Sequence, residues 1–141
     1  MDSILEMKQL KILKFLEIAK KIEGKTKFQK MIFLGKKEYE LDVGYSFEKY
    51  NYGPYSEELS RNLESLIDLG FIAVKEEIFD TEGHFPGVKN TYFITERGEK
   101  VLDREIFNEE ETTKVNKILT RWNNKSYKEI IDYVYSKYMN K

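Results

Sequence analysis

The chain of 141 residues contains no cysteine. Disulfide bonds, thiolate catalysis and cysteine-based zinc sites are therefore excluded. Histidine occurs once, as His84, in a segment that we expect to form a loop. The sequence also lacks a glycine-rich phosphate loop, a His-x-x-x-His pair and an isolated pair of carboxylates in an apolar setting. We therefore expect neither an enzyme nor a bound cofactor or metal.

Long apolar runs are absent as well. No stretch approaches the ~20 apolar residues that cross a membrane. Lys8, Lys11 and Lys14 interrupt any signal-type apolar segment near the start. These features predict a cytoplasmic protein without a membrane partner. Hydrophobic residues nevertheless make up 40% of the chain and aromatic residues 14%, which predicts a packed core.

The formal net charge is only −1, but the two signs are unevenly distributed along the chain. Residues 1–50 have 11 basic and 8 acidic residues, residues 51–100 have 5 and 10, and residues 101–141 have 8 and 7. Within the first part, residues 20–37 have seven lysines against one glutamate. A basic cluster of this kind can bind phosphates, whereas the acidic middle of the chain repels them.

The segment from Ser56 to Leu102 predicts the fold. Ser56 can cap a helix that runs to Leu69, with leucines on one side and Gly70 as a left-handed C-terminal cap. Strands are predicted over 71–74 and 91–94, joined by a loop with glycine and proline. Thr95 can cap a short helix that ends near Leu102. A helix, a two-stranded wing and a further capped helix are typical of a winged helix-turn-helix.

The flanking segments predict mostly helix. A first helix is expected over 3–22, ended by Gly24, and a second one capped by Thr26, in which Gly35 permits close approach of another element. Residues 44–52 predict a short strand, and Tyr-Gly-Pro-Tyr at 52–55 a turn. Two helices follow, one opened by the acidic run after Asn108 and one by a capping box, Ser126 with Glu129. We therefore predict an α+β, mainly α fold, with a winged helix-turn-helix domain at 1–104 and a C-terminal helical extension at 105–141 packed on it.

Six residues are candidates for binding double-stranded DNA. The predicted outward side of helix 56–69 offers residue types that read guanine and adenine edges, and the wing and the basic segment offer lysines for phosphates. The predicted nucleic-acid-binding residues are Arg61, Asn62, Lys89, Lys25, Lys27 and Lys30. They predict a DNA-binding or DNA-associated regulator.

An alternative function follows from the acidic residues on the same helix. Glu57, Glu64 and Asp68 share its outward side and repel phosphates. The alternative is a protein-interaction module, antitoxin-like, on a winged-helix scaffold that reads no bases. In either case we expect a homodimer, because the first and last helices have broad apolar faces.

Two segments carry a resemblance to known families. Residues 28–34 (FQKMIFL) and 47–56 (FEKYNYGPYS) resemble the YwgA-like family of bacteria and archaea, in which a Leu-Gln-Lys helix precedes a Tyr-Gly-Pro-Tyr-Ser turn. Phe28 stands where the family usually has Leu. A weaker likeness is to the Panacea antitoxin-like domains. Separately, Leu69–Ile72 with Tyr92–Gly98 is similar to the wing of PadR- and MarR-type proteins. The resemblance implies the fold more than an activity.

Overall fold

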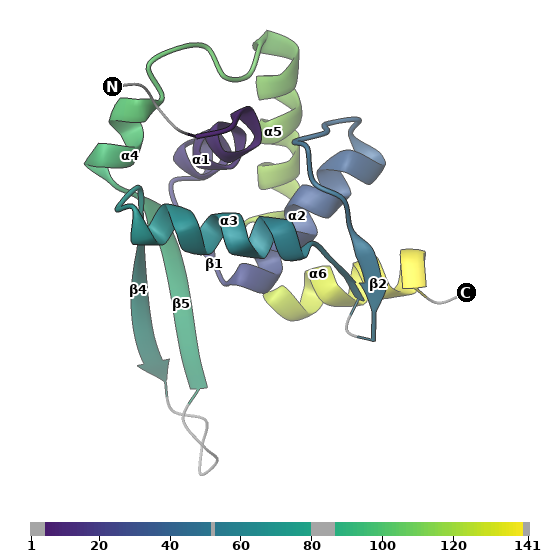
Figure 1. Cartoon of the computed structure of the whole chain (residues 1–141). Helices are drawn as coiled ribbons and strands as arrows, with labels where there is room; N and C mark the ends of the chain where they lie inside the picture. The colour runs from purple at the N-terminus through teal and green to yellow at the C-terminus, as the bar shows by residue number, and fades with distance from the viewer. Residues whose placement is uncertain (1–4, 52, 80–86, 140–141) are drawn as a thin grey trace.

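The computed structural model describes residues 5–51, 53–79 and 87–139, and has an α+β, mainly helical architecture (Figure 1). A hairpin of two long strands projects from the helical body, and α3 lies across its base. The helices are α1 (Met7–Ala19), α2 (Lys25–Glu38), α3 (Glu57–Asp68), α4 (Glu96–Val101), α5 (Glu109–Trp122) and α6 (Tyr127–Val134), which continues as the π-helical turn η1 (Tyr135–Met139). The strands are β1 (Ile22–Glu23), β2 (Glu48–Tyr50), β3 (Gly53–Tyr55), β4 (Ile72–Phe79) and β5 (Gly87–Ile94).

The main sheet has three antiparallel strands in the order β1-β5-β4. The two predicted strands of the wing are confirmed, but both are longer than predicted. Their outer halves project beyond the body and bury neither face, so no alternation of apolar and polar residues marks them. His84, in the predicted wing loop, lies outside the described residues.

Two boundaries near the first helix were predicted wrongly. The α1 helix ends at Ala19, because Ile22 and Glu23 leave the helix to form β1 and pair with Tyr92 and Thr91 of β5. The next helix begins at Lys25, so Thr26 lies inside α2 and does not cap it.

A second, two-stranded sheet connects α2 to α3. Its strand β2 pairs with β3 so that Lys49 lies opposite Pro54 and Tyr50 opposite Gly53. The prediction of a simple turn at 52–55 is therefore wrong for its described part, since Gly53–Tyr55 forms a strand. Gly53 has φ +112°, a backbone conformation that favours glycine.

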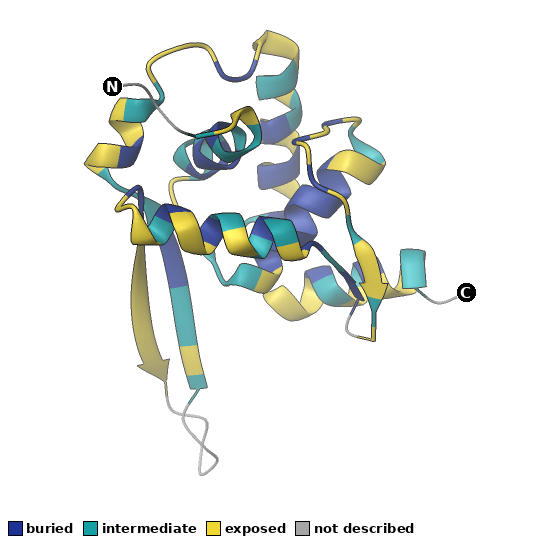
Figure 2. Ribbon diagram, in the orientation of Figure 1, coloured by how far each residue is buried: buried dark blue, intermediate teal, exposed yellow. Residues whose placement is uncertain are grey.

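The core surrounds α2, which is buried along most of its length, whereas β4 is exposed (Figure 2). Leucines of α3 pack against this core as predicted, and the predicted close approach at Gly35 is confirmed. A Cβ added there would lie 3.0 Å from Ile118 Cδ1 of α5. Residues on both sides of position 104 share the core, which includes Ile12, Leu16, Ile32, Leu63, Tyr92, Val115, Ile118, Trp122, Ile130 and Val134.

The C-terminal helix is fastened to the end of α2 by a polar cluster. Glu38 Oε2 accepts hydrogen bonds from the hydroxyls of Tyr138 (2.6 Å) and Tyr133 (2.8 Å) and from Lys137 Nζ (3.0 Å). Burial raises the pKa of Glu38, but these three bonds outweigh it and lower the pKa below its usual value. Buried residues of α1 and α6, among them Leu16, Ile130 and Val134, share the core of one molecule, whereas Met7 and Tyr127 stay exposed. The predicted homodimer stays a prediction.

Candidate macromolecular interface

The N-terminus of α3 is held by a buried polar clamp from α2. Ser56 caps the helix, because its Oγ accepts the N–H of Leu59 at 3.1 Å. The side chain of Gln29 binds the backbone of Ser56 twice: Oε1 accepts its N–H at 2.9 Å, and Nε2 donates to its carbonyl at 2.8 Å. Both residues are buried. The clamp therefore fixes the position of α3 by directional bonds.

Lys30 extends the same clamp to the hairpin. Its side chain is 2% exposed, and Nζ donates to the carbonyl of Pro54 at 2.8 Å. A Cβ at Gly53 would lie 3.5 Å from this ammonium, an ordinary contact distance, so the backbone conformation of Gly53 and not the space around it favours glycine. Burial lowers the pKa of Lys30. The prediction that Lys30 offers its charge at the surface is therefore wrong.

Lys27 is also withdrawn from the surface, contrary to prediction. Its residue is 3% exposed, and Nζ donates to the carbonyl of Asn123 at the end of α5, at 3.0 Å. Burial lowers the pKa of Lys27, and the nearby Glu23 carboxylate partly opposes that shift. The physical reason for both errors is the same: residues 27–35 of α2 are buried by the elements around them, so Lys27 and Lys30 meet protein on their sides of the helix.

The other predicted contacts near α3 are in part engaged within the molecule. Asn62 Nδ2 donates to the hydroxyl of Tyr45 at 2.7 Å, so its amide points back toward the body and not outward. Burial raises the pKa of Tyr45 to about 12. Lys25 Nζ donates to Ser60 Oγ at 3.1 Å. Of these candidates, only Arg61 projects outward, with 70% of its side chain exposed.

The exposed side of α3 is acidic. Its members are Glu57, Arg61, Glu64, Ser65 and Asp68, which gives three carboxylates and one guanidinium. Arg61 Nη1 lies 4.0 Å from Glu57 Oε1 and is the only cation among them. Lys89 on the β4–β5 hairpin also lies beside carboxylates, because its Nζ is 3.7 Å from Glu23 Oε2 and 3.9 Å from Glu77 Oε1. The structure thus brings Lys25, Arg61 and Lys89 to the α3–β5 side of the molecule, but the last two lie beside carboxylates.

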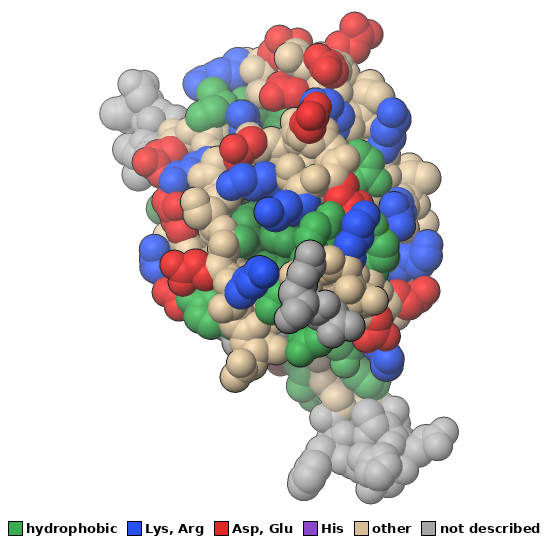
Figure 3. All heavy atoms as spheres, turned by 90° about the vertical axis from the view of Figure 1, so that its right-hand side faces the viewer, with side chains coloured by type: hydrophobic (Ala, Val, Ile, Leu, Met, Phe, Trp, Pro, Cys, Tyr) green, Lys and Arg blue, Asp and Glu red, His purple; other side chains and the backbone are tan. Residues whose placement is uncertain are grey.

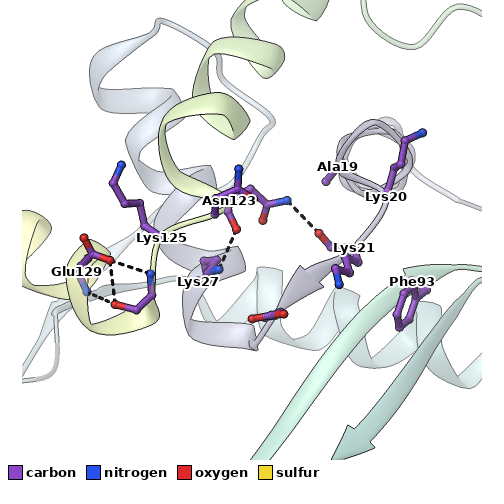
Figure 4. A pocket seen from close by; sticks show the side chains of 11 residues that line it. Ala19, Lys20, Lys21, Lys27, Phe93, Asn123, Lys125 and Glu129 are labelled. Carbon is purple, nitrogen blue, oxygen red and sulfur yellow. Dashed lines mark hydrogen bonds between the residues drawn. The ribbon is translucent and has the colours of Figure 1, made fainter.

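Sequence reasoning missed a basic pocket of about 960 Å³ beside β1 (Figure 4). It lies between the end of α1, the α5–α6 turn and Phe93 of β5, with Lys27 and Asn123 in its wall. Asn123 Nδ2 donates to the Lys21 carbonyl at 3.0 Å, while its buried Oδ1 has no partner among the described residues. The charged residues of its lining are Lys20, Lys21, Glu23, Lys27, Lys125 and Glu129.

Elsewhere the charges are mixed. On the face that carries β2 and the C-terminal helix, basic and acidic side chains alternate with apolar ones (Figure 3). Within 5–51, 53–79 and 87–139, no group of three or more His, Cys, Asp or Glu residues is placed to hold a metal ion. In the same part of the chain, no helix has the length and apolar character to cross a membrane.

Comparison with known proteins finds a relative over part of the chain. No family model matches the chain. The chain is 36% identical over 96 residues to the uncharacterized protein YwgA of Bacillus subtilis (strain 168). The matched region makes up 66% of this chain and 52% of YwgA. It therefore spans about half the length of that protein. The predicted likeness to YwgA is confirmed at this level, while the likenesses to Panacea, PadR and MarR proteins stay predictions.

Proposed function

We propose that the chain is a YwgA-like winged-helix protein that acts in the cytoplasm as a protein-interaction module, with the exposed side of α3 as its binding surface. The order of elements supports the winged helix: α1, β1, α2, α3 and then the β4–β5 hairpin, with β1 beside β5. One departure is the connection from α2 to α3. A helix-turn-helix has a turn of 3–4 residues between its two helices. In this chain α2 and α3 are joined by residues 39–56, which include the β2–β3 hairpin.

The acidic side of α3 is the observation that carries this function. A helix that enters the major groove meets phosphates on both sides, and its carboxylates repel them. On α3, Glu64 and Asp68 are exposed and Arg61 lies beside Glu57. Asn62, the other residue type suited to base reading, donates to Tyr45. A partner protein with a basic surface fits this side of α3, because charge complementarity favours and orients such an encounter.

A double charge reversal tests the proposal. Glu64→Lys with Asp68→Lys changes two exposed residues near the C-terminal end of α3, where cations suit the helix dipole, so folding is preserved. Glu99→Lys with Glu105→Lys is a matched control, because it makes the same change of charge at exposed sites away from α3. We expect the tagged wild type and the control to recover the same protein from a lysate of the source organism, and the α3 variant to lose it.

Titration against duplex genomic fragments supplies the second arm. At about 50 mM salt, where phosphate contacts are strong, we expect no saturable binding by the wild type. Two outcomes would overturn the interaction module. One is saturable DNA binding by the wild type that the control substitutions, Glu99→Lys with Glu105→Lys, leave unchanged. The other is equal recovery of partner proteins by the wild type and the α3 variant.

A DNA-associated regulator is the second candidate, and the basic pocket beside β1 favours it. Lys20, Lys21 and Lys125 line the pocket. This arrangement suits phosphate contacts without base reading. If DNA is bound there, changing Lys20, Lys21 and Lys125 to Gln lowers the slope of log affinity against log salt by about 2.7, at about 0.9 per lost contact.

A further inference from the structure

Strand β4 is an edge of the main sheet. It pairs with β5 on one side, and among the described residues no element lies along its other side where the hairpin projects from the body (Figure 1). Only its first residue, Ile72, is buried, while the next seven are exposed. Among them are large apolar side chains: Val74 is 39% exposed, Phe79 48% and Ile78 71%. A long exposed edge with such side chains is a template for pairing with another strand.

The sequence of β4 is complementary to itself when it is read in the opposite direction. Consider two antiparallel copies with Glu76 opposite Glu76. Lys75 then faces Glu77 of the other copy, and Val74 faces Ile78, and each of these pairs occurs twice. Paired residues share a face of the sheet, so the two Lys75–Glu77 pairs lie on one face and the two Val74–Ile78 pairs lie on the other, where they flank the central Glu76 pair.

We propose that β4 pairs with β4 of a second copy in this register, joining two three-stranded sheets into one of six strands around a two-fold axis. The rows across the new sheet support the register. Val88 lies opposite Ile78 within one molecule, so a row runs from Val88 through Ile78 to Val74 of the second copy. On the other face, Lys89 lies opposite Glu77, and the row continues to Lys75 of the second copy. Opposite charges alternate along it.

Neighbouring registers lack this complementarity. Centring the pair on Lys75 sets the two Lys75 side chains against each other and faces Val74 with Glu76. Centring it on Glu77 sets the two Glu77 side chains against each other and faces Ile78 with Glu76. In the proposed register the central Glu76 pair is the one like-charge contact along the strand, and it limits affinity. A second copy is favoured as the occupant because both strands bring the complementary residues.

Cysteine cross-linking tests the register, because the natural chain contains no thiol. Glu76→Cys places the new side chains directly opposite each other, within the Cα separation that a disulfide needs. Lys75→Cys and Glu77→Cys are matched controls, since each lies diagonal to its own copy at about 7–8 Å. Under mild oxidation we expect several-fold more covalent dimer from Glu76→Cys than from either control. In a mixture of the two control proteins, Lys75→Cys of one copy faces Glu77→Cys of the other. With one protein tagged, we therefore expect a cross-linked dimer that contains one copy of each.

Charge reversal tests the pairing without oxidation. Sedimentation velocity over a concentration series measures the dimer dissociation constant. Lys75→Glu and Glu77→Lys should each weaken the dimer by about tenfold, because each creates two like-charge pairs, and the double variant should restore it. Glu76→Gln should tighten it. Equal cross-linking at positions 75, 76 and 77, or a monomer at every concentration with both wild type and Glu76→Gln, would overturn the proposal. The thermal midpoint of each variant confirms that it is folded.

Discussion

Replacing Gln29 by Met tests whether the polar clamp positions α3. Methionine has nearly the same volume as glutamine, so the change removes the hydrogen bonds and leaves little cavity. Two bonds are lost: the one that accepts the Ser56 N–H at 2.9 Å and the one that donates to its carbonyl at 2.8 Å. The Ser56 carbonyl still accepts the N–H of Ser60 at 3.1 Å, whereas its N–H is left buried without that acceptor.

These losses set the expected magnitude. The donated bond contributes about 1 kcal/mol, and a buried N–H without an acceptor costs about 1–3 kcal/mol. We therefore expect Gln29→Met to lower the free energy of unfolding by about 2–4 kcal/mol. Urea unfolding measures it, and the fluorescence of Trp122, the single tryptophan, reports the transition.

Gln9→Met is the matched control. The Oε1 of Gln9 also accepts a backbone N–H, that of Glu6 at 2.8 Å, but this contact is exposed and water can replace it. We expect a loss of about 0.5–1 kcal/mol there. A loss below 1 kcal/mol for Gln29→Met, or equal losses for the two variants, would refute the view that burial makes the clamp strong.

Three further outcomes are expected. The pKa values of Lys27 and Lys30 are lowered in the fold, so the unfolded chain binds more protons between those lowered values and pH 10.5. Stability therefore rises with pH within that window only, and Lys27→Met with Lys30→Met flattens the rise in urea unfolding. The lowered pKa of Glu38 stabilises the fold above pH 4.5 and the gain is lost in acid, so Glu38→Gln reduces the loss of thermal stability on acidification. Gly98→Ala lowers stability by about 1–3 kcal/mol in calorimetry, because its Cβ meets the Phe71 carbonyl.

Local signals predicted local structure well. Ser56, Thr95 and Ser126 each accept a backbone N–H at the start of the helix that they were expected to cap. Gly70 has φ +85°, as a left-handed cap requires. These predictions succeeded because capping depends on a few consecutive residues.

Predictions of which lysines are exposed depended on surroundings, and they failed. A lysine in a helix is usually exposed, so Lys27 and Lys30 were expected at the surface. Their burial depends on how many elements pack around α2, which no pattern within the helix records. The basic pocket has the same origin, because it joins Lys21 to Asn123, about a hundred positions later in the chain. One sequence signal for the clamp was available: segments 28–34 and 47–56 carry the family resemblance together, and the clamp brings these two segments into contact.

The clamp has a practical consequence for protein design. It holds α3 through Gln29, Ser56 and the buried leucines, none of which is part of the helix's exposed side. The positions of Arg61, Glu64, Ser65 and Asp68 can therefore be randomised together while the backbone beneath them stays fixed. The chain is in this sense a display scaffold: a short helix held at its N-terminus by the clamp and along its buried side by leucines, on which new recognition sequences can be selected without rebuilding the fold.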